Sequence, residues 1–284
     1  MNVAIVGLGL IGGSFALSLK LNFPYVKRFG VDNNPEHEKK ALRLGIIEDV
    51  LENGQISEMD VVVVSIPVDK SAHVIQNILD QVHSKALVID MGSTKGQLCE
   101  AIANHPMRDQ FLAAHPIAGT EFSGPEAAFA SLFTEKTMIF CDADATRPEL
   151  HERAKALIEP LHMKLKYMSA KEHDKHLAYV SHLSHISSFM LGKTVLQVEQ
   201  NDKTIFDLAG SGFASTVRLA KSNPVTWTAI FKENHEEVVK ALDGYIKNLK
   251  AFKTQLEIEN YSDIHQQLSE VNSLKPILNG ILNK

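Results

Sequence analysis

The apolar run Val3-Ala4-Ile5-Val6, followed by Gly7-Leu8-Gly9-Leu10-Ile11-Gly12, decides the fold at the start of the chain. The run predicts a buried strand, and the residues after Gly9 predict an amphipathic helix. The three glycines have different roles, since Gly7 allows a tight turn, Gly9 lets the backbone approach a pyrophosphate, and Gly12 lets the helix pack on the sheet. Because the helix N-terminus adds free N–H groups for the phosphates, the stretch predicts a dinucleotide site.

Asp32 indicates which dinucleotide binds. It closes a second apolar run, Phe29-Gly30-Val31, about twenty residues after the glycine turn. A carboxylate there accepts the ribose hydroxyls of NAD and repels the 2′-phosphate of NADP. The next residues, Asn33-Asn34-Pro35-Glu36, hold no Arg or Lys to bind that phosphate. The sequence therefore favours NAD, with NADP as the alternative.

The length and composition bound the remaining possibilities. A chain of 284 residues forms one large domain or two ordinary ones, and 44% hydrophobic residues suffice for a substantial core. The formal net charge of −5 argues against a general nucleic-acid binder. The two cysteines, Cys99 and Cys141, are expected to be small core residues. No apolar run reaches membrane-spanning length, and because the first residues are already a strand we expect no signal peptide and a cytoplasmic protein.

Strand-like and helix-like segments alternate through the first half of the chain. Beyond the opening unit, apolar runs predict strands at 60–67, 86–90, 111–114, 137–140 and 165–168, and helices are expected at 70–81, 95–103 and 148–161. Such alternation gives an α/β, doubly wound sheet, in which ligands gather at the carboxyl ends of the strands. The residues expected to contact the cofactor are Gly7, Gly9, Leu10, Ile11, Gly12, Asp32, Ser65 and Pro67.

Strand signals vanish after Met168. Long helices are expected at about 171–200, 224–252 and 256–282, the last interrupted at Pro276. About 115 residues make only a modest core, so these helices need further surface to pack on. We therefore expect a domain of residues 1–168 that binds the dinucleotide and an all-α domain of residues 169–284 that also pairs with another subunit.

Two stretches follow predicted sheet strands and carry candidate chemistry. In Asp90-Met91-Gly92-Ser93-Thr94-Lys95-Gly96, the hydroxyls of Ser93 and Thr94 either face the cleft or cap the next helix. The second stretch begins at His115. A neutral histidine at the carboxyl end of a strand, beside a nicotinamide, can accept a proton from a substrate hydroxyl. Among the 13 histidines, His115 is the best placed for this role.

Two further stretches lie in the helical half. His182 and His185 are three residues apart on one helix face, and with His173 and His176 they suggest a metal site. Because no cysteine or acid completes a familiar zinc pattern, we expect no metal and place one of the pair at the cleft. Arg218 follows a glycine-rich bend, where it either binds a carboxylate or is a solvated surface charge.

These stretches, in this order, resemble the prephenate/arogenate dehydrogenase family of tyrosine biosynthesis. The resemblance spans nearly the whole chain, and the motif that begins at His115 is highly specific. The matches are G-L-G-L-I-G-G-S at Gly7–Ser14, D-x-G-S-x-K at Asp90–Lys95, H-P-I-A-G-T-E-x-S-G at His115–Gly124, S-H-L-x-H at Ser181–His185, G-F-x-x-x-x-R at Gly212–Arg218 and N-P-x-x-W at Asn223–Trp227.

The resemblance implies a Rossmann domain followed by a helical domain that dimerises, and an NAD-dependent oxidative decarboxylation of prephenate. His115 would accept a hydrogen bond from the ring hydroxyl of the substrate, and Ser93 would share that hydroxyl. Arg218 would hold a substrate carboxylate, and His185 would sit between nicotinamide and substrate. The residues implied to border the pocket entrance are Thr120, Glu121 and Trp227.

Several alternatives stay open at this point. Arogenate, which carries an alanyl side chain where prephenate has a pyruvyl one, fits the same motifs. Where the family usually has a basic residue and an aspartate after Gly-Phe, this chain has Ala214 and Ser215, which weakens inference about substrate choice and feedback by tyrosine. A β-hydroxyacid or 6-phosphogluconate type of dehydrogenase, and a protein that binds NAD without turnover, are weaker alternatives because neither explains His115.

Overall fold

The computed structural model describes residues 1–120, 122–200 and 204–282. Its contacts divide the chain into two compact units, Met1–His235 and Glu236–Lys284, which are described separately below. In the described part of the chain, no helix is both long and apolar enough to cross a membrane.

An eight-stranded sheet forms the centre of the first unit, as far as its residues are described, with the order β3-β2-β1-β4-β5-β6-β7-β8. Strands β1 to β6 all run parallel. Strands β2 and β3 lie on one side of β1, and β4, β5 and β6 lie on the other. In such a sheet, ligands bind at the carboxyl ends of the strands where the strand order reverses, which here is between β1 and β4. The strand bounds are β1 Asn2–Val6, β2 Lys27–Val31, β3 Asp49–Val50, β4 Val61–Val64, β5 Leu87–Asp90, β6 Phe111–Ile117, β7 Thr137–Cys141 and β8 Lys164–Met168.

The predicted doubly wound sheet is confirmed, with one difference at its edge. Strand β7 runs antiparallel to β6, and β8 runs parallel to β7, so the last two strands oppose the other six. A parallel pair needs a crossover, usually a helix. The described residues between β6 and β7 provide only a 3₁₀ turn, Pro125–Ala127, whereas α5 (Pro148–Ile158) connects β7 to β8.

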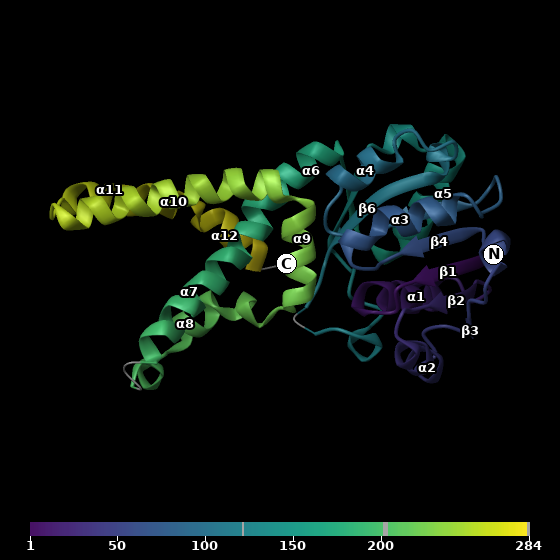
Figure 1. Ribbon diagram of the computed structural model, residues 1–284, viewed down its shortest axis with the longest axis horizontal. Coiled ribbons are helices and arrows are strands. Elements are labelled where there is room, and N and C mark those ends of the chain that lie inside the picture. Colours follow the sequence, from purple (N-terminus) through teal and green to yellow (C-terminus); the bar gives the residue numbers. More distant parts are fainter. Residues whose placement is uncertain (121, 201–203, 283–284) are drawn as a thin grey trace. The chain divides into compact units, whose positions relative to one another are not determined.

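Helices cover both faces of this sheet and bury its central strands (Figure 1). Helices α1 (Leu10–Asn22), α2 (Pro35–Arg43) and α5 pack on one face. On the other face lie α3 (Val68–Leu79), α4 (Gly96–Ile102) and α6 (Ala170–Leu177). Strand β4 serves both cores, since Val61 and Val63 face one side while Val62 and Val64 face the other. This burial explains why continuous apolar runs predicted the strands correctly.

The chain after β8 is helical, as predicted. A π-helical turn, Ala178–His182, joins α6 directly to α7 (Leu183–Glu199), so the expected helix at 171–200 has a wide turn inside it. Turns of this kind are frequent at functional sites. The unit continues with α8 (Ser211–Thr216), a 3₁₀ turn at Arg218–Lys221 and α9 (Pro224–Glu233).

The expectation of one helix over residues 224–252 is wrong. The chain forms α9 and then α10 (His235–Glu257), with a break at Asn234. The side chain of Asn234 is buried and its Nδ2 donates to the backbone oxygen of Asp174, 2.8 Å away. This long-range contact holds Asn234 outside helical geometry, and the apolar periodicity on either side of it gives no sign of the break.

The second unit contains most of α10 together with α11 (Tyr261–Val271) and α12 (Lys275–Leu282). The interruption expected at Pro276 lies just before it, at the 3₁₀ turn Asn272–Leu274. Pro276 itself is in the first turn of α12, where a missing backbone N–H costs little.

Candidate active site

The glycine turn between β1 and α1 has the geometry that a dinucleotide needs. Gly7 has a φ of +94°, and a Cβ there would lie 2.5 Å from the backbone oxygen of Ser65. A Cβ on Gly12 would lie 2.1 Å from the oxygen of Gly7, so both positions exclude a side chain. Gly9 is the opposite case, because a Cβ there would meet nothing within 4 Å. The turn is therefore closed toward the protein and open at Gly9, where a pyrophosphate would approach.

Asp32 lies directly after β2 and beside this turn. Its Oδ2 accepts the N–H of Leu8 at 2.8 Å, and its Oδ1 accepts the N–H of Asn34 at 2.9 Å. Its Oδ1 also lies 3.2 Å from Nδ1 of His37. The carboxylate is thus fixed at the end of the strand, as a partner for ribose hydroxyls must be. This acceptor carboxylate and the open glycine turn fit NAD.

Ser65 and Pro67 follow β4, at the next strand end. The hydroxyl of Ser65 donates to the backbone oxygen of Gly7 at 2.9 Å and so ties the two loops together. Both Ser65 and Pro67 line a cavity at this edge of the sheet.

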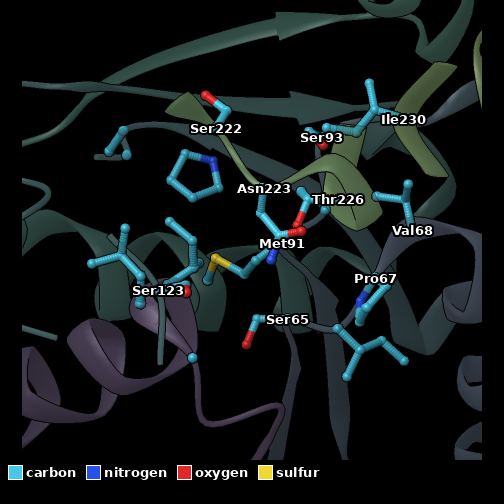
Figure 2. Close-up of a pocket in the computed structure, with 18 of the residues that line it drawn as sticks. Ser65, Pro67, Val68, Met91, Ser93, Ser123, Ser222, Asn223, Thr226 and Ile230 are labelled. Atoms are coloured by element: carbon cyan, nitrogen blue, oxygen red, sulfur yellow. The ribbon is translucent and has the colours of Figure 1, made fainter. Parts of the chain in front are cut away.

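The cavity has a volume of about 390 Å³ and connects the glycine turn with the candidate catalytic residues. Figure 2 shows side chains from segments far apart in the sequence around it, with Ser65 and Ser222 at opposite sides in that view. The predicted site residues that line it are Gly9, Leu10, Ile11, Ser65, Pro67, Ser93, His115, Thr120 and Trp227. Gly7, Gly12 and Asp32 are not among the described lining residues.

His115 lies near the carboxyl end of β6 and is half-buried. Its Nδ1 is 2.8 Å from Nε2 of His173, a residue of α6. Desolvation holds the pKa of His115 well below its ordinary value, and the charges of His173 and Lys95 lower that pKa further. The imidazole is therefore neutral at pH 7 and able to accept a proton.

A buried ion pair fixes the loop that carries Ser93. Lys95 is completely buried, pairs through Nζ with Asp90 and also donates to the backbone oxygen of Gly92 at 2.6 Å. A cation and an anion out of contact with water persist only when paired, so this loop has little freedom. The D-x-G-S-x-K stretch is thus explained as a structural clamp that presents Ser93 to the cavity.

His185 and Trp227 pack together in the helical part of the first unit. Their rings stack with centroids 3.4 Å apart and an interplanar angle of 22°. Trp227 lines the cavity, but His185 is not among the described lining residues. Partial burial lowers the pKa of His185, and the nearby positive charge of Arg218 lowers it further.

Arg218 is exposed and does not line the cavity, as far as the described residues show. It has no hydrogen bond or ion pair with another residue in the described part of the chain, so its guanidinium fork is available to an anion. Thr120 is exposed at the cavity, and its Oγ1 accepts the N–H of Phe122 at 3.2 Å. Glu121 lies outside the described residues.

No group of three or more His, Cys, Asp or Glu side chains is placed to hold a metal ion among the residues that the structure describes. His182, one of the histidines considered for such a site, instead contacts Nδ2 of Asn234 at 3.1 Å through its Nδ1. Burial lowers the pKa of His182 to about 4, so the ring is neutral at physiological pH.

Sequence reasoning missed two groups of residues. The first is Asp174 together with the contact of His173 with His115, since His173 was considered only as a metal ligand; the contact joins His115 to α6 across 58 positions of sequence. The second is Ser222, Asn223 and Thr226 at the start of α9, which line the cavity. The N-P-x-x-W match at Asn223–Trp227 was the available signal for the second group. No local signal points to the first.

Comparison with known proteins gives a consistent result. A family model described as "Prephenate dehydrogenase, nucleotide-binding domain" matches residues 15–167, and "Prephenate dehydrogenase, dimerization domain" matches residues 169–270. Prephenate dehydrogenase of Bacillus subtilis is 29% identical over 92% of this chain and 72% of its own. Cyclohexadienyl dehydrogenase of Zymomonas mobilis is 30% identical over 90% of this chain and 88% of its own.

The fold is also similar to solved structures. Prephenate dehydrogenase from Aquifex aeolicus, in complex with hydroxyphenyl propionate and NAD⁺, superimposes with a TM-score of 0.90 and 34% identity, covering 97% of both chains. The two family models together span most of the sequence, and the one described as nucleotide-binding begins at residue 15, directly after the glycine turn and within α1. The chain therefore belongs to the prephenate dehydrogenase family of NAD-dependent oxidoreductases.

Proposed function

We propose that this protein oxidises prephenate and releases carbon dioxide from it, giving 4-hydroxyphenylpyruvate. The observation that carries the proposal is the shared cavity: Gly9 of the cofactor turn and His115 line the same space of about 390 Å³. A substrate hydroxyl in that space meets a neutral imidazole next to the cofactor side. A site of this kind needs little covalent chemistry from the protein, because aromatisation of the ring supplies the driving force, and positioning dominates.

NAD is the cofactor, and when bound it supplies the acceptor for the hydride that leaves the hydroxyl-bearing ring carbon. The residues of the chain do the rest. His115 accepts a hydrogen bond from the ring hydroxyl and polarises it as the carbon becomes ketone-like. Ser93, held by the Asp90–Lys95 clamp, shares that hydroxyl.

The remaining roles concern the substrate's carboxylates and the entrance. Arg218 binds a carboxylate, supported by its exposure and by the absence of a partner among the described residues. His185 orients substrate against the nicotinamide together with Trp227, on which it stacks. Thr120 borders the entrance. Arogenate has the same hydroxyl-bearing ring and is the alternative substrate.

Formation of NADH tests this function directly. The purified protein is incubated with prephenate or with arogenate, and with NAD or with NADP, and the reduced cofactor is followed by absorbance. We expect the highest kcat/KM with prephenate and NAD, together with release of carbon dioxide. Turnover of arogenate alone would transfer the proposal to the alternative substrate, and no turnover of either compound would reject it.

Replacement of Asp32 with serine is expected to raise the kcat/KM ratio of NADP to NAD by at least about tenfold. The substitution removes an anion that faces the 2′-phosphate of NADP. The ratio is the correct measure because loss of the Leu8 contact affects both cofactors equally. Glu36→Ser, which removes an exposed acid at the start of α2, is the matched control and should leave the ratio unchanged. An unchanged ratio in Asp32→Ser would refute this role.

We also propose that the chain has a cofactor domain (1–168) and a helical domain (169–284). The helices of the second domain are proposed to form a homodimer. Helix α7 supports this, since among its 17 residues only Ser188 is buried in the single chain. Apolar side chains such as Leu196, 56% exposed, need a partner surface. The two buried, unpaired cysteines further suit a cytoplasmic enzyme.

Sedimentation at micromolar concentration should show a dimer. We expect the interface of this dimer to bury on the order of 2,000 Å² or more. Leu196→Asp should weaken this dimer because it places a charge on the proposed interface. Leu21→Asp in α1, at a site that is 74% exposed, is the control and should not. A fully active monomer at that concentration would contradict the proposal.

A further inference from the structure

A chain of three side chains runs from the cavity into the protein. Nδ1 of His115 lies 2.8 Å from Nε2 of His173, and Nδ1 of His173 lies 2.8 Å from Oδ1 of Asp174. His173 is completely buried and Asp174 is 4% exposed, so little water competes for these contacts. Both nitrogens of His173 therefore have a partner, and the direction of donation is decided at the Asp174 end.

Asp174 is surrounded by donors. Its Oδ1 accepts the N–H of Lys95 at 2.8 Å, and its Oδ2 accepts the N–H of Gly96 at 2.6 Å. Both oxygens thus accept hydrogen bonds from backbone N–H groups, and a carboxylate donates none. His173 must therefore donate to it through Nδ1–H.

The direction of each further hydrogen bond follows from this donation. Burial lowers the pKa of His173, although its contact with Asp174 opposes that shift. The ring is thus neutral and carries one hydrogen, on Nδ1, which leaves Nε2 as an acceptor. The only way to satisfy the contact between the two rings is that His115 donates from its own Nδ1. Its Nε2 then has no hydrogen and is the acceptor nitrogen of the ring.

We propose that His173 and Asp174 are positioning residues that hold His115 in the tautomer with a free Nε2, and that they share the positive charge when His115 takes a proton. The inference rests on the role proposed above for His115. The groups that face the two rings are Asp90 at the end of β5, Lys95 directly before α4, Asp174 on α6 and His182 in the π-helical turn. Among them, only Asp174 is an anion in direct contact with a ring, so it is the group that offsets the charge.

Proton transfer along the chain balances without any further reactant. A proton accepted at Nε2 of His115 makes an imidazolium, and the hydrogen on its Nδ1 can pass to Nε2 of His173. His173 keeps its Nδ1–H on Asp174, so the charge then lies next to the carboxylate. Return of the same protons restores the resting state.

Nitrogen-15 NMR of protein labelled at histidine tests the tautomer without requiring turnover. The signals of His115 are identified as those lost in His115→Asn. At pH 8 we expect a protonated Nδ1 and an unprotonated Nε2 for His115, and the same pattern for His173. A His115 with hydrogen on Nε2 would overturn the inference, whatever the enzyme's substrate proves to be.

Kinetics of Asp174→Asn and His173→Phe test the consequence for the reaction. Each substitution should lower kcat by at least about tenfold, and by up to about 10⁴-fold if the wrong tautomer of His115 dominates. The KM for substrate and the affinity for NAD should change by less than about threefold. Removal of the anion in Asp174→Asn also lowers the pKa of the ring pair, so the acid limb of the kcat profile should move to lower pH.

His176→Gln, an exposed histidine on the same helix, is the matched control and should match the wild type in both measurements. If kcat and the acid limb are unchanged in a folded Asp174→Asn protein, the positioning role is wrong. If that variant does not fold, the NMR result on the wild type still decides the tautomer. Absence of activity in the wild type would reject the proposed function and leave the NMR test intact.

Discussion

Replacement of His115 with asparagine is expected to lower kcat by about 10²–10⁴-fold, the usual contribution of a positioned general acid or base. Asparagine is close in size and polar, so the cavity keeps its shape, but an amide does not take up a proton. The affinity for NAD should change little, because the glycine turn and Asp32, which are proposed to hold the cofactor, are unchanged in this variant. Steady-state kinetics and calorimetric titration with NAD measure the two effects separately.

The control for this substitution is His176→Asn, which changes an exposed histidine that is not among the described cavity-lining residues. It should leave kcat at the wild-type value. A His115→Asn protein that retains more than about a tenth of wild-type kcat would show that another group interacts with the hydroxyl.

Replacement of Arg218 with alanine is expected to reduce kcat/KM by about 30-fold to several-thousand-fold, the cost of losing one partner of a charge pair that ligand binding desolvates. In the free protein Arg218 is exposed, so this effect arises only if the bound substrate covers the guanidinium. The loss should appear mainly in KM, provided that the contact is equally strong in the ground state and the transition state. Arg218→Lys should recover only part of it, because an ammonium lacks the planar fork.

Lys221→Ala is the matched control, since Lys221 is an exposed cation in the same 3₁₀ turn. We expect it to change kcat/KM by no more than about twofold, as a solvated surface charge does. If Arg218→Ala behaves like Lys221→Ala with saturating NAD, Arg218 is a surface residue and the substrate carboxylate binds elsewhere.

The geometry of the glycine turn was predictable because its requirements are local. A positive φ at Gly7 and the close approach at Gly12 allow only glycine, so the geometry is visible as a residue type at a fixed spacing. The strands were predictable for a related reason. A parallel strand buried on both faces must be apolar along its length, as Val61–Val64 is.

Contacts between distant segments were not predictable in this way. The reversal of β7 and β8 depends on the connection between β6 and β7, which has no crossover helix in its described residues. The break at Asn234 depends on a hydrogen bond to the backbone of Asp174, 60 residues away. The apolar periodicity of α9 and α10 gives no sign of that bond, because periodicity reports only which face of a helix is buried.

In the candidate site too, the local features were predictable from the sequence and the contacts between distant segments were not. The sequence by itself determined the glycine turn, the acid at Asp32, and His115 at the end of a strand, because each is set by residue type and spacing within one βα unit. Only the tertiary structure decided that His115 is joined to Asp174 through His173, and that Arg218 lies outside the described cavity lining. The physical reason is that a hydrogen bond between side chains needs two groups within about 3 Å, and packing of the whole fold brings such groups together.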